Sequence, residues 1–178
     1  MGAVARAARA GDGAVLGVIP KELMPREVSG EMIGETIIAR DMHDRKATMA
    51  AQADAFIALP GGFGTLEELM EVVTWQQLGY HGKPVGVLNI NDFYLHFLQF
   101  LDHCEEQVWN PVHCDHWGCA AWTMTEGGGA VQGFLRKDCR KILIERTDAG
   151  ELIDALAAYT PAEPVIEVIK QERAADQA

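Results

Sequence analysis

The sequence predicts an α/β fold, a doubly wound parallel sheet with helices on both faces. Two observations lead to this prediction. Short apolar runs of strand length alternate along the chain with longer segments of helical periodicity, and this alternation is typical of parallel sheets covered by helices. A loop with three glycines also joins one of these strands to the next helix, which is where proteins of this class bind ligands.

The expected elements follow from the apolar spacing and from the turn residues between them. Strands are expected at 14–19, 55–59, 83–88 and 142–144, and helices at 2–10, 41–53, 65–78, 92–106 and 148–159. Gly11 should close the first helix, and Pro20 should end the first strand. In the fourth helix, Phe93, Phe97 and Phe100 recur at helical spacing, which favours the core or a subunit contact.

The length and composition favour one globular domain. The chain has 178 residues, 48% of them hydrophobic, which is enough to build a core. We expect this domain over residues 1–161, followed by a charged and polar tail at 162–178. Residues 107–132 interrupt the domain, and translated non-coding sequence or a disordered loop explains them best. This stretch contains four candidate metal ligands, His113, Cys114, His116 and Cys119. Their spacing matches no standard zinc finger, so no metal is expected.

The charge and the absence of long apolar runs exclude several classes of function. The formal net charge of -11 argues against binding to nucleic acid or to an anionic membrane surface. No apolar run approaches the roughly 20 residues that a membrane span needs, and the first residues do not have the pattern of a secretory signal. The four cysteines are irregularly spaced and form no disulfide framework. We therefore expect a cytoplasmic protein, with the nucleus as an alternative location.

The most informative stretch covers residues 59–74 and reads LPGGFGTLEELMEVVT. Glycines let the backbone approach a ligand closely, and the first amides of a helix favour negative charge. A phosphate or nucleotide is therefore expected at Gly61, Gly62, Gly64 and Thr65. The alternative is structural, because Thr65 and Glu68 have the spacing of a capping box. The loop is neither a Walker A loop nor a G-x-G-x-x-G loop.

The helix after this loop is expected to have two faces. The apolar face should pack in the core and contains Leu66, Leu69, Met70 and Val73. The polar face contains Glu67, Glu71 and Thr74, which recur at helical spacing. A capping box would explain Glu68 but not Glu67, so the acidic residues here remain candidates for a site.

A second set of candidates lies upstream of the loop. Met42, Arg45 and Met49 share one face of the helix at 41–53. An arginine in such a stripe is usually a surface residue whose stem lies along apolar neighbours. The helix leads into the strand before the glycine loop, however, so Arg45 could bind phosphate or ribose oxygens while Lys46 adds a charge. Glu27, by sequence alone, is an ordinary loop carboxylate.

Two motifs identify a family that this chain resembles. Residues 60–68 match the pattern PGGxGTxxE, and residues 42–49 match M-x-x-R-K-x-x-M. Together they are similar to the LONELY GUY family of cytokinin riboside 5′-monophosphate phosphoribohydrolases, and the resemblance implies a Rossmann-like fold. It extends from Met1 to about residue 106 and over about 133–161. Met1 coincides with the end of the second glycine-rich turn of the family, so the strand–helix–strand unit that normally precedes it is absent from this sequence.

The resemblance also implies an activity and a set of site residues. The activity is hydrolysis of the N-glycosidic bond of a cytokinin nucleotide, with Glu68 and Arg45 as catalytic residues. The substrate-binding residues would be Glu27, Arg45, Lys46, Gly61, Gly62, Phe63, Gly64, Thr65, Leu66, Glu67 and Thr74. No metal or other cofactor is implied, the partner is a small nucleoside monophosphate, and family members are typically homodimers. The alternatives are a non-catalytic nucleotide-binding protein, an inactive fragment of the family, or a broader hydrolase that acts on AMP.

Overall fold

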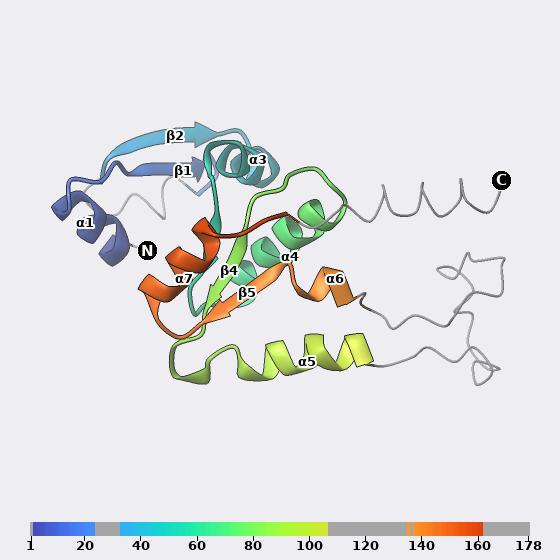
Figure 1. Ribbon diagram of the computed structural model, residues 1–178. Helices are drawn as coiled ribbons and strands as arrows, with labels where there is room; N and C mark the ends of the chain where they lie inside the picture. Colours follow the sequence, from blue (N-terminus) through green and yellow to red (C-terminus); the bar gives the residue numbers. More distant parts are fainter. Residues whose placement is uncertain (1, 24–32, 107–134, 136, 162–178) are drawn as a thin grey trace. The chain divides into compact units, whose positions relative to one another are not determined.

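The computed structural model describes residues 2–23, 33–106, 135 and 137–161 (Figure 1). The chain forms two compact units, one up to Asp54 and one from Ala55 onward. In the described residues all strand pairs are parallel, and the strands form two sheets of two and three strands. Helices and parallel strands alternate, which confirms the predicted α/β class. The single domain expected over residues 1–161 thus contains two units, and the stretches at 107–132 and 162–178 lie outside the described residues.

The first unit is a two-stranded parallel sheet with a helix packed on it (Figure 1). Its elements are α1 (Gly2–Ala10), β1 (Leu16–Pro20), β2 (Glu35–Ala39) and α3 (Met42–Gln52). The strands pair from Leu16 opposite Glu35 to Pro20 opposite Ala39. The side chain of Asp41 caps α3 by accepting a hydrogen bond from the amide of Asp44 at 2.8 Å. The predicted helix at 41–53 is therefore confirmed.

Three details of the first unit differ from the sequence analysis. The strand β2 was missed, although its β-branched run at residues 36–38 favours a strand. The strand β1 starts two residues later than expected and includes Pro20, because the ring nitrogen of a proline can occupy a position where the sheet needs no donor. At the end of α1 the left-handed residue is Asp12, with φ 63°, rather than Gly11, and aspartate tolerates this conformation better than most residues.

The second unit is a three-stranded parallel sheet in the order β3–β4–β5. Its elements are β3 (Phe56–Ala58), α4 (Phe63–Gln77), β4 (Val85–Leu88), η1 (Ile90–Asp92), α5 (Leu95–Glu106), α6 (Lys137–Arg140), β5 (Leu143–Arg146) and α7 (Ala149–Ala157). The predicted strands at 55–59, 83–88 and 142–144 are therefore confirmed, with ends that differ by one or two residues. The predicted last helix is confirmed as well.

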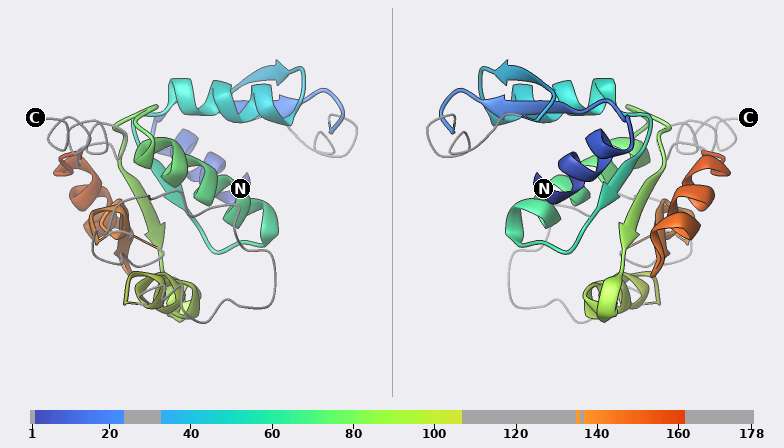
Figure 2. Two further views of the ribbon diagram at one scale, coloured as in Figure 1. Left: turned by 90° about the vertical axis from the view of Figure 1, so that its right-hand side faces the viewer. Right: turned by 90° about the vertical axis from the view of Figure 1, so that its left-hand side faces the viewer.

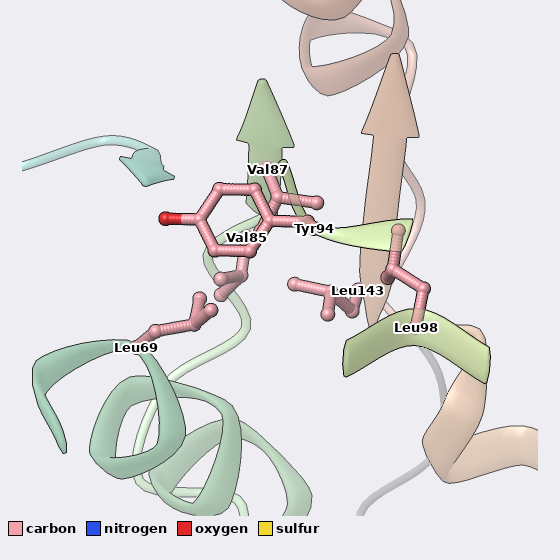
Figure 3. Close-up of a cluster of buried hydrophobic side chains, with 6 residues drawn as sticks. All are labelled: Leu69, Val85, Val87, Tyr94, Leu98 and Leu143. Atoms are coloured by element: carbon pink, nitrogen blue, oxygen red, sulfur yellow. The ribbon is translucent and has the colours of Figure 1, made fainter. Parts of the chain in front are cut away.

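Helices cover both faces of this sheet. Val85 and Val87 of the central strand β4 pack toward α4 and α5, and Leu88 packs toward α7. Figure 2 shows α4 and α7 on opposite sides of β4. The larger core is drawn in Figure 3 and consists of Leu69, Val85, Val87, Tyr94, Leu98 and Leu143. On the other face Gly86 lets α7 come close, since an added Cβ would lie 2.8 Å from Leu152 Cδ1.

The helix α5 shows how far spacing alone predicts packing. The helix expected at 92–106 begins at Leu95, after the short turn η1, because Asn91 and Asp92 have positive φ and cannot be helical. Phe97 packs against the larger core as predicted, whereas the side chains of Phe93 and Phe100 are exposed. Of the helices that the structure describes, none combines the length and apolar character needed to cross a membrane.

Candidate functional site

The glycine loop connects β3 to α4 at the carboxyl end of the strand (Figure 1). The helix α4 begins at Phe63 with Gly62 as its N-cap, and the Gly62 carbonyl accepts the amide of Leu66 at 3.1 Å. The prediction that Thr65 opens the helix is wrong by two residues. The capping-box alternative is wrong as well, because Thr65 is the third residue of the helix and cannot be its N-cap.

The first turn of α4 is not capped by its own N-cap residue. In the described structure Gly62 makes no side-chain cap hydrogen bond, and the first turn contains no acidic residue. The first amides of a helix have no partner within the helix, and the helix dipole makes this end attractive to anions. The local structure therefore suits the binding of a phosphate group.

The glycines of the loop differ in what they allow. An added Cβ at Gly61 would lie 2.2 Å from Thr65 Oγ1, so the close packing of Thr65 requires a glycine there. At Gly62 and Gly64, by contrast, no described atom lies within 4 Å of an added Cβ. Gly62 has φ -93° and ψ -154°, a conformation that other residues can adopt. Neither the backbone nor the packing of the described chain explains why Gly62 and Gly64 lack side chains. Bare backbone is expected where a ligand comes close.

Three side chains of α4 near the loop lie in different surroundings. The Phe63 side chain is 93% exposed. Glu67 is exposed, whereas Glu68 is half-buried, since consecutive residues point about 100° apart around the helix. The half-buried carboxylate of Glu68 is better shielded from water than that of Glu67. A shielded carboxylate is the better candidate for stabilising a positive charge.

Two predicted substrate-binding residues of α4 point elsewhere. The Leu66 side chain packs against the larger core, so only its backbone could meet a ligand. Thr74 lies nine residues beyond Thr65, about 13 Å along the helix axis. Its hydroxyl donates a hydrogen bond to the carbonyl of Met70 at 2.7 Å. Met70, which was expected in the core, is partly exposed. The binding roles of Leu66 and Thr74 stay predictions.

The predicted residues outside both the glycine loop and α4 belong to the first unit. Arg45 of α3 is half-buried, and its Nε donates a hydrogen bond to the carbonyl of Val18 in β1 at 3.2 Å. This contact restrains the guanidinium group. Met42 and Met49 on the same face are partly exposed, and Lys46 is half-buried. Arg45 and Glu68 lie in different units, so their pairing stays a prediction. Glu27 lies outside the described residues.

The sequence analysis missed a set of polar side chains at the carboxyl ends of the strands in the second unit. Asn89 directly follows β4 and hydrogen-bonds Glu145 of β5 and the backbone of Tyr94. Tyr94 in turn hydrogen-bonds the carbonyl of Leu59, the residue before the glycine loop. A polar residue directly after an apolar strand was the available signal, because parallel α/β sheets place their sites at this edge.

Metal binding has no visible basis in the part of the chain that the structure describes. No group of three or more His, Cys, Asp or Glu side chains is placed there so that it could hold a metal ion. The four candidate ligands at residues 113–119 lie outside the described residues. The glycine loop and the first two turns of α4 offer backbone amides, carboxylates and a hydroxyl group.

Comparison with known proteins supports the motif analysis. The sequence model of the family described as "Possible lysine decarboxylase" matches residues 1–121, which is more than half of the chain. The chain belongs to this family. Its curated relatives are LONELY GUY proteins, so the resemblance found in the two motifs is confirmed.

Several curated relatives of this chain come from plants. Cytokinin riboside 5′-monophosphate phosphoribohydrolase LOG7 of Arabidopsis thaliana is 47% identical over 161 residues, which is 90% of this chain and 63% of the relative. LOG of Oryza sativa subsp. japonica is also 47% identical over 161 residues, 90% of this chain and 56% of the relative. The probable cytokinin riboside 5′-monophosphate phosphoribohydrolase LOGL1, also of Oryza sativa subsp. japonica, is 45% identical over 160 residues. These residues cover 90% of this chain and 60% of the relative. The chain thus spans about 60% of the length of these relatives.

Proposed function

We propose that this chain hydrolyses the N-glycosidic bond of cytokinin riboside 5′-monophosphates and releases the free base and ribose 5-phosphate. The observation that supports this most directly is the loop at Gly62 and Gly64, where no feature of the described chain requires a glycine. The names of relatives with 44–47% identity supply the substrate class. The same function would make the chain a nucleotide-binding enzyme, and hydrolysis of this bond requires no metal or redox cofactor.

The loop would hold the 5′-phosphate of the nucleotide. The N-cap residue Gly62 makes no side-chain cap hydrogen bond, and the first amides of a helix have no partner within the helix. A phosphate dianion accepts several hydrogen bonds there and is further favoured by the helix dipole. Thr65, which packs against Gly61, can add its hydroxyl group as a donor. Phosphate binding would thus set the position of the ribose.

Glu68 would act on the bond between the ribose and the base. In the reaction the C1′–N bond breaks, the oxygen of water bonds to C1′, and the base leaves with a proton. The transition state has positive charge on the ribose ring, as in other glycoside hydrolyses. A half-buried carboxylate can stabilise that charge and remove a proton from the attacking water. Glu68 is our candidate for this role, one helical turn away from the loop.

The remaining predicted residues would bind the substrate. Arg45 would hold ribose or phosphate oxygens with its guanidinium group, which the Val18 carbonyl already restrains. Lys46, Glu27, Glu67 and Phe63 would line the substrate. As in the implied family pattern, we propose a homodimer in the cytoplasm.

The test compares two glutamate variants on isopentenyladenine riboside 5′-monophosphate. Glu68→Gln should lower kcat by at least about 100-fold, the usual loss when general acid–base catalysis is removed, while the Kd for the nucleotide changes little. Glu67→Gln makes the same chemical change on the exposed neighbour and should mainly raise KM. Release of base by Glu68→Gln at a near-normal rate would reject the assignment.

The same loop would also suit a protein that binds nucleotides without catalysis. Uncapped amides and bare glycines explain binding, but they do not require a carboxylate beside the ribose. Base release measured together with the ligand-induced shift in Tm distinguishes the two functions. A shift with no release of base by the wild-type chain would favour the binding protein. Release of adenine from AMP at a comparable rate would favour the broader hydrolase.

A further inference from the structure

Hydrogen bonds join the carboxyl ends of all three strands of the second unit. Asn89 follows β4 and donates from its backbone amide to the carbonyl of Arg146, the last residue of β5, at 2.8 Å. Its side-chain Nδ2 donates to Glu145 Oε1 at 2.6 Å. The Asn89 side chain is only 2% exposed, so water does not compete strongly for these bonds. The ends of β4 and β5 are therefore held together by one buried amide side chain.

The same amide side chain continues the connection toward β3. Asn89 Oδ1 accepts the backbone amide of Tyr94 at 2.7 Å. The Tyr94 hydroxyl then donates to the carbonyl of Leu59 at 2.6 Å. Leu59 follows β3 and directly precedes Pro60, the first residue of the glycine loop. The chain of hydrogen bonds thus ends at the point where the loop begins.

The ring of Tyr94 is held firmly enough to transmit this position. Tyr94 is 1% exposed and packs in the core with Leu69 of α4 and Val87 of β4 (Figure 3). Its ring also makes edge contacts with Phe93 and Phe97, at centroid distances of 5.0 and 6.3 Å. Burial raises the pKa of Tyr94 above its ordinary value, so the group remains a hydrogen-bond donor at neutral pH.

We propose that Tyr94 is a positioning residue for the glycine loop. Its hydroxyl holds the Leu59 carbonyl, and Pro60 limits the rotation that follows, so this bond contributes to the direction of the amides at Gly62 and Phe63. Asn89 supports Tyr94 from the other two strands. That the ligand at these amides is the phosphate of a nucleotide rests on the function proposed above, whereas the effect on the loop does not.

The variant Tyr94→Phe removes one oxygen atom and leaves the ring in the core. It should raise KM for the nucleoside monophosphate, and Kd for inorganic phosphate, by about fivefold, which is the usual net effect of one hydrogen bond. The value of kcat should change by less than about twofold, because Glu68 is not touched. Adenine, which has no phosphate, should bind as tightly to the variant as to the wild-type chain.

The matched control is Tyr159→Phe. The Tyr159 hydroxyl accepts a hydrogen bond from Gln76 Nε2 near the other end of α4, so this variant loses one tyrosine hydroxyl in the same unit but away from the loop. A purely structural contribution of Tyr94 would lower Tm in both variants to a similar extent. A positioning role predicts weaker phosphate binding in Tyr94→Phe alone.

Amide hydrogen exchange in the ligand-free chain tests the proposal without reference to catalysis. Exchange at residues 61–66 should be faster in Tyr94→Phe than in both the wild-type chain and Tyr159→Phe. Equal exchange in the two variants would overturn the proposal, and so would equal Kd values for phosphate. If the wild-type chain releases no base, the proposed reaction fails, but the exchange rates still decide whether Tyr94 positions the loop.

Discussion

The N-terminus of α4 and the N-terminus of α7 lie in the same unit, and each follows a strand of the same parallel sheet. At α7 the side chain of Asp148 accepts the amides of Gly150 and Glu151, at 2.8 and 3.0 Å. At α4 the equivalent position is Gly62, and no described side chain caps the helix. The helix α7 thus has a negatively charged N-cap side chain, whereas the N-cap residue of α4 has no side chain.

Under the proposed function, the difference separates a structural helix start from one that binds a phosphate. The helix α3 in the first unit resembles α7, since Asp41 caps it. At an N-cap, aspartate is better than glycine by only roughly a few tenths of a kcal/mol, so α4 gives up a small stabilisation that an aspartate at Gly62 could supply. The geometry would allow that aspartate, because Gly62 has open space and an extended backbone. Folding therefore does not require glycine at this position, and the proposed binding of a phosphate would account for it.

The largest expected effect comes from making α4 resemble α7. In Gly62→Asp the new carboxylate should cap the helix and raise Tm slightly, while it occupies the amides and repels a phosphate. The Kd for the nucleoside monophosphate should rise by about 100-fold or more, since two hydrogen bonds to a charged group are lost. Calorimetric titration and thermal unfolding measure the two changes. Unchanged affinity would mean that the phosphate binds elsewhere.

The second effect is on stability, and it should differ between two glycines of the same loop because their surroundings differ. In Gly61→Ala the added Cβ would meet Thr65 Oγ1 at 2.2 Å, so the free energy of unfolding should fall by about 2 kcal/mol, as for other overpacked sites. In Gly64→Ala the methyl group has open space, and alanine in a helix should raise the free energy of unfolding by about 0.5–1 kcal/mol. Denaturant unfolding measures the change in the free energy of unfolding for each variant. A change of the same sign in both variants would contradict the geometry of the loop.

The smallest effect is expected at α7. Asp148→Ala removes the side chain that accepts two amides, and the free energy of unfolding should fall by about 1 kcal/mol. The Kd for the nucleotide should stay unchanged, because this helix start is not part of the proposed site. Calorimetric titration gives the Kd, and denaturant unfolding gives the free energy of unfolding. A loss of affinity equal to that in Gly62→Asp would remove the distinction between the two helix starts.

Most elements could be predicted because their signals are local. Apolar runs at strand length predicted β3, β4 and β5, and helical spacing predicted α3 and α4. The start of α4 was predicted at Thr65 because threonine is a favoured N-cap residue, whereas glycine is a weaker signal. The helix nevertheless begins after Gly62, since Thr65 is needed inside the first turn to pack against Gly61.

The site was predictable to the extent that its residues are close in sequence. The loop and Glu68 follow from one motif, and the structure brings Gly61, Gly62 and Thr65 together around a single turn. The contacts of Tyr94 and Asn89 could not be read from the sequence, because they join residues 35 and 56 positions apart. No local pattern encodes such a pairing. The direction of the Leu66 side chain was likewise decided by packing in the core.

The double placement of Tyr94 has a consequence for protein engineering. Its ring fills the centre of the larger core, and its oxygen touches the backbone just before the loop. Heat tolerance gained by repacking these apolar neighbours would therefore alter substrate affinity at the same time. A library that varies this core should be screened for both properties together.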